Sequence, residues 1–214
     1  MKNVAKMSAK DALARLRDGN SRFVQGDRCI DTYLSHTKLD QHLGGQAPFA
    51  VILGCSDSRV PVEIIFDAGL GDLFVIRVAG NIVAPSLIGS VELAAENFGP
   101  RLVVVLGHTG CGAIQATIDA LRQPSSGNSH HVNSIVNRIR PAVEGLLDAG
   151  TGLASDDIAA KAVRANVRAS VDRLRHGSDT LERLIDDDGL VIVGAEYSLE
   201  TGLVEFFDGV PGSG

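Results

Sequence analysis

The sequence predicts an α/β fold in which a central, mostly parallel β-sheet of four parallel strands plus an antiparallel edge strand is flanked by helices. Four continuous apolar runs carry this prediction, because continuous rather than alternating hydrophobicity is typical of parallel strands covered on both faces. A fifth run follows the turn signal Glu200-Thr201-Gly202, so it should form a hairpin and lie antiparallel at one edge. The expected strands are residues 48–54, 73–76, 102–106, 190–195 and 203–207.

The segments around these strands have helical periodicity. Ser8 followed by Asp11 resembles a capping box and predicts an amphipathic helix near the N-terminus. The last expected helix, residues 156–176, has Ser155 as its N-cap and Gly177 at its end. Its apolar stripe consists of Ile158, Val163, Val167, Val171 and Leu174. The other expected helices are residues 86–98, 112–122 and 132–147.

We expect one domain, because nothing in the 214 residues marks a linker between independent cores. Residues 1–46 would form an N-terminal helical arm and its connection, and residues 47–214 the α/β core. The net charge of −6, with Lys and Arg scattered, indicates neither a nucleic acid nor an anionic membrane as partner. With no secretory signal and no apolar run near the ~18 residues of a membrane helix, we expect a cytoplasmic protein.

Two motifs each follow an expected buried strand. Residues 55–59 read Cys-Ser-Asp-Ser-Arg, and residues 108–112 read His-Thr-Gly-Cys-Gly. Ligands in open parallel sheets lie outside the carboxyl ends of the strands, so the two motifs can meet there if their strands are neighbours. The thiols of Cys55 and Cys111 and the imidazole of His108 form a donor set that suits Zn²⁺ and leaves a fourth position for water or substrate.

Asp57 and Arg59 are two residues apart, so in an extended turn they project to the same side and can pair. A charge-assisted hydrogen bond between them would fix the carboxylate beside the metal. Asp57 could then accept a hydrogen bond from zinc-bound hydroxide, or it could bind zinc itself as the fourth ligand. The residues alone leave both roles open.

The two motifs, read as Cys-Ser-Asp-Ser-Arg-Val-Pro and His-Thr-Gly-Cys-Gly, resemble those of the β-class carbonic anhydrases. The likeness includes residues 17–23 and 71–77 and covers most of the chain. It implies a lyase that converts CO₂ reversibly to bicarbonate and a proton through zinc-bound hydroxide, with one Zn²⁺ per chain. It further implies a homodimer with the site at its interface, which the N-terminal helix helps to build, or a homotetramer as a dimer of dimers. By this resemblance the zinc ligands are Cys55, His108 and Cys111, and the catalytic dyad is Asp57 and Arg59.

The resemblance also assigns residues to the substrate pocket. Gln46 matches a glutamine that hydrogen-bonds the substrate, and Phe74 matches an aromatic side chain that lines the CO₂ pocket. Ala79 and Leu93 fall where plant members carry Val and Tyr, so the pocket should be apolar and lack a tyrosine hydroxyl. Gly112 completes the expected substrate-binding set.

Some bacterial members of the family have an inhibitory bicarbonate site built on a tryptophan, and this chain contains no tryptophan. We therefore expect a site in which water or hydroxide is the fourth zinc ligand near neutral pH. Two alternatives remain at this stage: hydrolysis of CS₂ or COS on the same fold, and a non-catalytic structural zinc module closed by Asp57. Cys29 would be a spare thiol, because a reducing compartment favours thiolates over disulfides.

Overall fold

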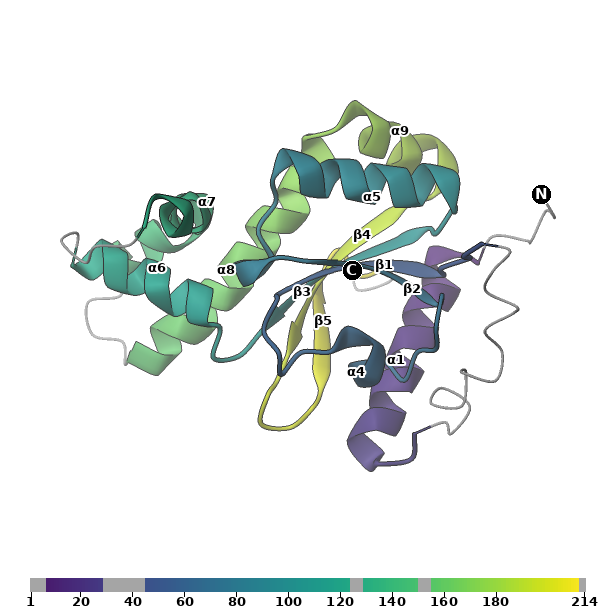
Figure 1. Cartoon of the computed structure of the whole chain (residues 1–214), viewed down its shortest axis with the longest axis horizontal. Coiled ribbons are helices and arrows are strands. Elements are labelled where there is room, and N and C mark those ends of the chain that lie inside the picture. The colour runs from purple at the N-terminus through teal and green to yellow at the C-terminus, as the bar shows by residue number, and fades with distance from the viewer. Residues whose placement is uncertain (1–6, 29–44, 124–128, 150–154, 212–214) are drawn as a thin grey trace.

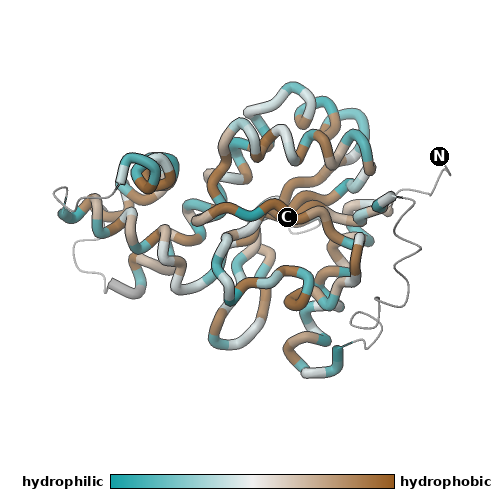
Figure 2. Tube along the Cα trace, viewed as in Figure 1, coloured by the Kyte–Doolittle hydropathy of each residue, from teal (hydrophilic) through white to brown (hydrophobic). Residues whose placement is uncertain are grey.

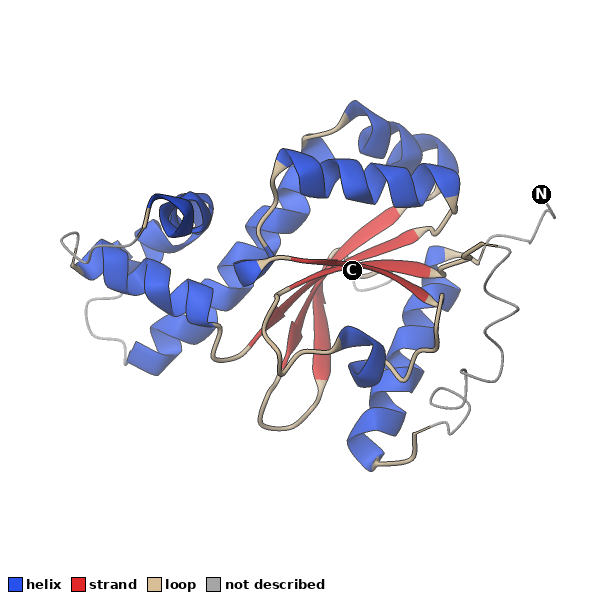
Figure 3. Ribbon diagram, in the orientation of Figure 1, coloured by secondary structure: helices blue, strands red, loops and turns tan. Residues whose placement is uncertain are grey.

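A five-stranded sheet forms the centre of the protein, whose computed structural model describes residues 7–28, 45–123, 129–149 and 155–211 (Figures 1 and 3). The strand order is β2-β1-β3-β4-β5. The first four strands are parallel, and β5 pairs antiparallel with β4. This arrangement confirms the predicted fold class. The strands are β1 (Ala50–Gly54), β2 (Leu73–Arg77), β3 (Leu102–His108), β4 (Val191–Tyr197) and β5 (Val204–Asp208).

Helices cover both faces of the sheet, which explains the continuous apolar runs. One face packs against α1 (Ala9–Gln25) and the short α4 (Val62–Ile65). The other face packs against α5 (Pro85–Asn97), α8 (Ser155–His176) and α9 (Asp179–Asp188). Alternate strand residues serve the two faces: Ile52 packs on the α1 side and Val51 on the α8 side. Figure 2 shows the hydrophobic residues gathered along the strands between the two helical layers.

A third hydrophobic cluster lies beyond the carboxyl ends of the strands. It joins α6 (Gly112–Arg122), α7 (His130–Ala149) and the N-terminal half of α8. The 3₁₀ turn η2 (Ala79–Asn81) lies next to it. Cys55 and Cys111 are members of this cluster, so the candidate site has a packed apolar wall on one side.

Helix α1 begins where the capping box predicts. The Ser8 Oγ accepts a hydrogen bond from the Asp11 backbone N–H at 3.1 Å, and the helix ends at Gly26 with φ 73°. The buried face of α1 packs on the sheet of its own chain through residues such as Leu13 and Leu16. Within the described chain this helix is therefore part of the core. Whether it also helps to build a dimer stays a prediction.

The structure departs from the expected elements in three places. His108 is the last residue of β3 rather than part of the following turn, because the ladder to β4 continues through the pair His108 and Tyr197. Helix α9 was not predicted, although Ser178 caps it and Gly189 ends it at φ 69°. The short α4 and η2 were also missed, as helices this short leave little periodic signal. Cys29 and residues 29–44 of the expected connection lie outside the described residues.

No helix among the described residues is both long enough and apolar enough to cross a membrane.

Candidate metal centre

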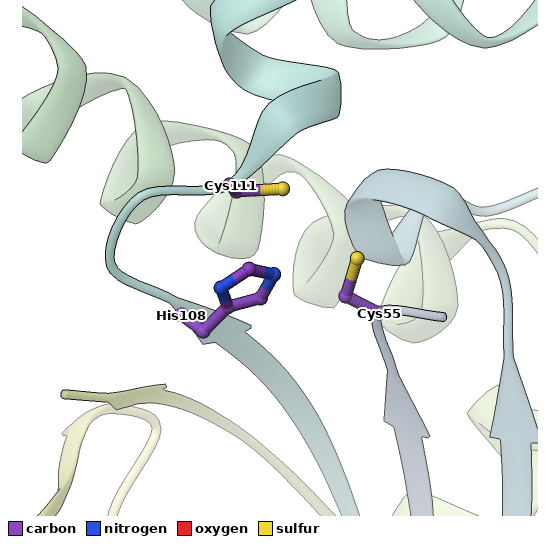
Figure 4. A group of neighbouring side chains, drawn as sticks. All are labelled: Cys55, His108 and Cys111. Carbon is purple, nitrogen blue, oxygen red and sulfur yellow. The ribbon is translucent and has the colours of Figure 1, made fainter. Parts of the chain in front are cut away.

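Cys55, His108 and Cys111 converge on one point at the carboxyl edge of the sheet. Their ligand atoms all lie within 4.8 Å of one another. Figure 4 shows both sulfur atoms and the imidazole ring directed toward a shared space, with Cys55 after β1, His108 at the end of β3 and Cys111 before α6. All three side chains are buried. The structure thus brings together the three residues that the sequence predicted as ligands.

The strand order explains this convergence. From β1 the chain goes to β2 on one side and later to β3 on the other, so the topological switch point lies between β1 and β3. Gly54 is in register with Leu106, which places Cys55 beside the end of β3. Ligand sites of open parallel sheets lie at such a point.

The protonation of His108 fits a metal ligand. Its Nδ1 lies 2.9 Å from the Thr109 carbonyl oxygen, and because a carbonyl only accepts, Nδ1 is the donor. In the neutral ring Nε2 then carries a lone pair, and this buried atom has no hydrogen-bond partner among the described residues. An unsatisfied imidazole nitrogen beside two thiols is the donor set expected for Zn²⁺.

The contact between Cys55 and Cys111 shifts the pKa values of the two thiols in opposite directions. The hydrogen bond from Cys111 lowers the pKa of Cys55 to about 4, and the Gly80 N–H adds to this effect. The same contact with Cys55, together with burial, raises the pKa of Cys111. The contact between the two sulfur atoms therefore favours the thiolate form of Cys55, the form in which a cysteine binds a metal ion.

Asp57 is held by Arg59 at the edge of the cluster. The Arg59 Nε donates to Asp57 Oδ1 at 2.9 Å and Nη2 donates to Oδ2 at 2.8 Å, while the Arg59 backbone N–H also donates to Oδ1 at 2.9 Å. These hydrogen bonds hold the pKa of Asp57 well below its usual range. Asp57 Oδ2 remains 3.9 Å from His108 Nε2. The carboxylate thus stands beside the candidate metal site as an ionised, oriented acceptor.

Two neighbours of the cluster were not singled out from the sequence. The Gly80 N–H donates to Cys55 Sγ at 3.3 Å, and Arg77 donates to the carbonyl oxygens of Cys55 at 2.9 Å and Asp57 at 2.5 Å. Both follow from β2, which lies beside β1 with Gly54 in register with Arg77. The only signal in the sequence was Arg77, a charged residue at the end of the apolar run that forms β2.

Two of the expected pocket residues lie near the cluster. Ala79 precedes Gly80, whose N–H contacts Cys55 Sγ. Gly112 is the first residue of α6, directly after Cys111, and a Cβ added there would meet no heavy atom within 4 Å. The space beside this turn is open and could admit a small molecule.

The other three expected pocket residues lie elsewhere in the same chain. Gln46 precedes β1 at the amino edge of the sheet, and the strand of about 17 Å separates it from Cys55. Phe74 is in register with Val51 near that edge, and its ring lies 5.9 Å from that of Phe98. Leu93 is exposed on α5. A single protomer therefore does not bring Gln46 to its own metal cluster.

Comparisons with known proteins identify the family of this chain. The sequence profile of the carbonic anhydrase family matches residues 50–204. Carbonic anhydrase 2 of Mycobacterium tuberculosis is 38% identical over 190 residues, which are 87% of this chain and 87% of that protein. A β-carbonic anhydrase of Coccomyxa, solved with acetazolamide, has a TM-score of 0.71 at 25% identity and covers 91% of this chain and 86% of its own.

A third comparison shows the fold alone. One of two tetrameric β-carbonic anhydrases from Sordaria macrospora has a TM-score of 0.73 at 23% identity, over 82% of this chain and 89% of that chain.

Fold and cluster together define an α/β protein with a candidate Cys₂His metal centre at the switch point of its sheet. The chain belongs to the carbonic anhydrase family, and within it to the β class.

Proposed function

We propose that this chain catalyses the reversible hydration of CO₂ to bicarbonate and a proton, with one Zn²⁺ held by Cys55, His108 and Cys111. The observation that carries the proposal is the buried cluster. In it an imidazole nitrogen with no hydrogen-bond partner among the described residues lies near two thiols and beside a carboxylate oriented by Arg59. Zinc in such a site would act as a Lewis acid and lower the pKa of a bound water molecule toward neutrality. Three ligands from the protein leave a coordination position for that chemistry.

Asp57 orients the reacting water. Arg59 occupies both carboxylate oxygens from one side, and the remaining lone pairs can accept a hydrogen bond from a water molecule at the cluster. Because Arg59 hydrogen-bonds both carboxylate oxygens, Asp57 is favoured as a hydrogen-bond acceptor beside the metal rather than as its fourth ligand. A crystal structure of the zinc-loaded protein at neutral pH with Asp57 coordinated to the ion would contradict this role.

Arg59 also ties the two ligand motifs together. Its Nη2 donates to the Gly110 carbonyl oxygen at 3.3 Å, across the site from the segment that carries Asp57. The carboxylate is therefore fixed relative to both the Cys55 segment and the Cys111 turn, the orientation that proximity effects require.

Stopped-flow CO₂ hydration with a pH indicator tests the function. We expect rapid hydration by protein that carries one zinc per chain. This rate should be lost when a chelator removes the metal and should return when zinc is added back. An absence of hydration above the chelated control in fully loaded protein would reject the proposal. The same preparation would then be assayed with CS₂ and COS, where turnover would identify a sulfur-substrate hydrolase and its absence a structural zinc module.

We further infer a homodimer in which each pocket is completed by the partner chain. Gln46 and Phe74 lie toward the amino edge of the sheet, away from the metal cluster of their own chain. A second copy could present these residues and Leu93, which is 48% exposed, to that cluster. The Sordaria relatives are tetrameric, and a dimer of dimers is the corresponding assembly for this chain. The cytoplasmic location stays a prediction.

Hybrid dimers test this sharing. Gln46→Ala should lower the hydration rate of the homodimer about tenfold, the factor for one lost hydrogen bond of about 1.4 kcal/mol. A hybrid dimer of one Gln46→Ala chain and one Cys55→Ser chain can be purified through two tags. In it the Gln46→Ala chain supplies the one intact set of metal ligands, and the Cys55→Ser chain supplies the intact Gln46. The hybrid should recover about half of the wild-type rate. A hybrid no faster than half of the Gln46→Ala homodimer would show that Gln46 does not act across the interface.

A further inference from the structure

Helix α8 lies unusually close to the sheet beneath the metal cluster. A Cβ built on Gly107 would lie 2.6 Å from Val167 Cγ2, and one built on Gly194 would lie 2.8 Å from Val167 Cγ1. Glycine at these two positions of β3 and β4 lets the helix reach this depth. Two polar residues of α8 near Val167, Asn166 and Ser170, are thereby brought within hydrogen-bonding distance of η2.

Asn166 and Ser170 use this position to bind the η2 turn. They lie one helical turn apart on α8, so their side chains point to the same side. Asn166 Nδ2 donates to the Gly80 carbonyl oxygen at 2.8 Å, and Ser170 Oγ donates to the Asn81 carbonyl oxygen at 3.1 Å. Both side chains are almost fully buried, at 2% and 4% exposure. Two consecutive carbonyls of one turn are therefore held from one helix.

The turn contains two left-handed residues in succession. Gly80 has φ 70° and ψ 21°, and Asn81 has φ 42°, a left-handed conformation that few non-glycine residues adopt. Asn81 Nδ2 is buried and makes no hydrogen bond to the described residues, so this side-chain nitrogen does not hold the turn. A Cβ on Gly80 would lie 2.8 Å from Ile139 Cδ1, so the turn is also wedged against α7.

The η2 turn contacts the metal cluster through one hydrogen bond. The Gly80 N–H donates to Cys55 Sγ at 3.3 Å, at a buried position. A hydrogen bond to a thiolate stabilises its charge, and groups that orient a metal ligand affect metal affinity. This N–H belongs to the Ala79–Gly80 peptide, which joins the Gly80–Asn81 peptide at the Gly80 Cα. Holding the carbonyls of Gly80 and Asn81 from α8 therefore restricts the direction in which the N–H points.

We propose that Asn166 and Ser170 are positioning residues for the metal centre: by holding the Gly80–Asn81 turn, they keep its N–H on the sulfur of Cys55. The inference rests on the proposed zinc function and deepens it. It assigns to the buried polar face of α8, far from the ligands in sequence, a role in metal affinity. Hydrogen-bonded supports of this kind are worth about 10- to 100-fold in affinity, and because these act through a turn we expect the lower end.

The first test uses metal-free protein. The variants are Asn166→Ala and Ser170→Ala, with Ser178→Ala as the matched control, since Ser178 is a buried serine that caps α9 and hydrogen-bonds Glu92. Hydrogen exchange of the Gly80 amide, followed by NMR, should be slow in the wild type and at least about tenfold faster in Asn166→Ala. Ser178→Ala should lower thermal stability and leave the Gly80 exchange rate unchanged.

The second test measures the metal directly. Chelator competition should show zinc affinity about tenfold lower in Asn166→Ala, a smaller loss in Ser170→Ala, and wild-type affinity in Ser178→Ala. In cobalt-substituted protein the thiolate-to-cobalt absorption should move to lower energy in the two α8 variants, because a sulfur that loses its N–H bond gives up electrons more easily. A residue that only stabilised the fold would not move this band.

The two tests separate the inference from the function beneath it. Asn166→Ala and Ser170→Ala proteins that lose stability as Ser178→Ala does, yet keep the Gly80 exchange rate, zinc affinity and cobalt spectrum of the wild type, would overturn the positioning role. A wild-type chain that bound no zinc would overturn the proposed function and the affinity effect with it. Gly80 exchange in the metal-free protein would still show whether α8 holds the turn.

Discussion

Cys55→Ser is expected to lower zinc affinity by at least about a thousandfold, because a serine hydroxyl stays protonated at neutral pH and cannot replace a thiolate ligand. The hydrogen bond from Cys111 lowers the pKa of Cys55, which favours the thiolate form that binds metal, and serine lacks this form at neutral pH. Hydration of CO₂ should fall to the rate of the chelated wild type. Chelator competition and zinc content per chain measure the effect.

Stability provides a second measure of the same substitution. A ligand that binds only the folded chain stabilises it, by about 2.7 kcal/mol when its free concentration is 100 times its dissociation constant. Zinc should therefore raise the melting temperature of the wild type and leave that of Cys55→Ser unchanged. Cys29→Ser is the matched control, since the sequence predicts a spare thiol there, and it should keep the zinc response. A zinc response preserved in Cys55→Ser would remove this residue from the ligand set.

The sheet could be predicted from the sequence because its strands are buried on both faces. All residues of β1 are buried, and such a strand reads as one apolar run without alternation. The order of the strands was less accessible, since apolar runs do not say which strands are neighbours. That β1 and β3 are neighbours was the condition for bringing Cys55 to His108, and the structure confirms it.

The ligands could be predicted because their chemistry is local. Cys55 stands at the end of one apolar run, and His108 and Cys111 at the end of another, so residue type and spacing carry the signal. The pocket residues are different, because Gln46 and Phe74 are not near the cluster within one protomer. The role proposed for them depends on a second chain, which the pattern of one chain does not describe.

The supports of the cluster could not be predicted at all. Asn166 and Ser170 interrupt an apolar helix face, and a polar residue in such a pattern usually indicates solvent. Their partners are carbonyls 86 and 89 residues away in the chain. A backbone carbonyl has no sequence signature, so a buried polar side chain can be recognised only once the fold supplies its partner.

Asp57→Asn should keep zinc bound and lower CO₂ hydration by about 100-fold, the effect typical of losing one oriented polar group at a reacting centre. Asparagine has the shape of aspartate but no charge, and its amide nitrogen cannot accept a hydrogen bond from Arg59 or from water. Arg59 would lose the paired contact of Nε and Nη2 that now orients it. Zinc content per chain and stopped-flow hydration measure the two effects separately.

Asp72→Asn is the matched control, because Asp72 also accepts a hydrogen bond from an arginine, Arg15 Nη2 at 2.7 Å, at a position before β2. This variant should retain zinc and wild-type hydration. Full activity in Asp57→Asn would exclude the carboxylate from the mechanism. Loss of zinc in Asp57→Asn, with zinc retained in Asp72→Asn, would contradict the role of a non-coordinating acceptor and would show that Asp57 contributes to zinc binding itself.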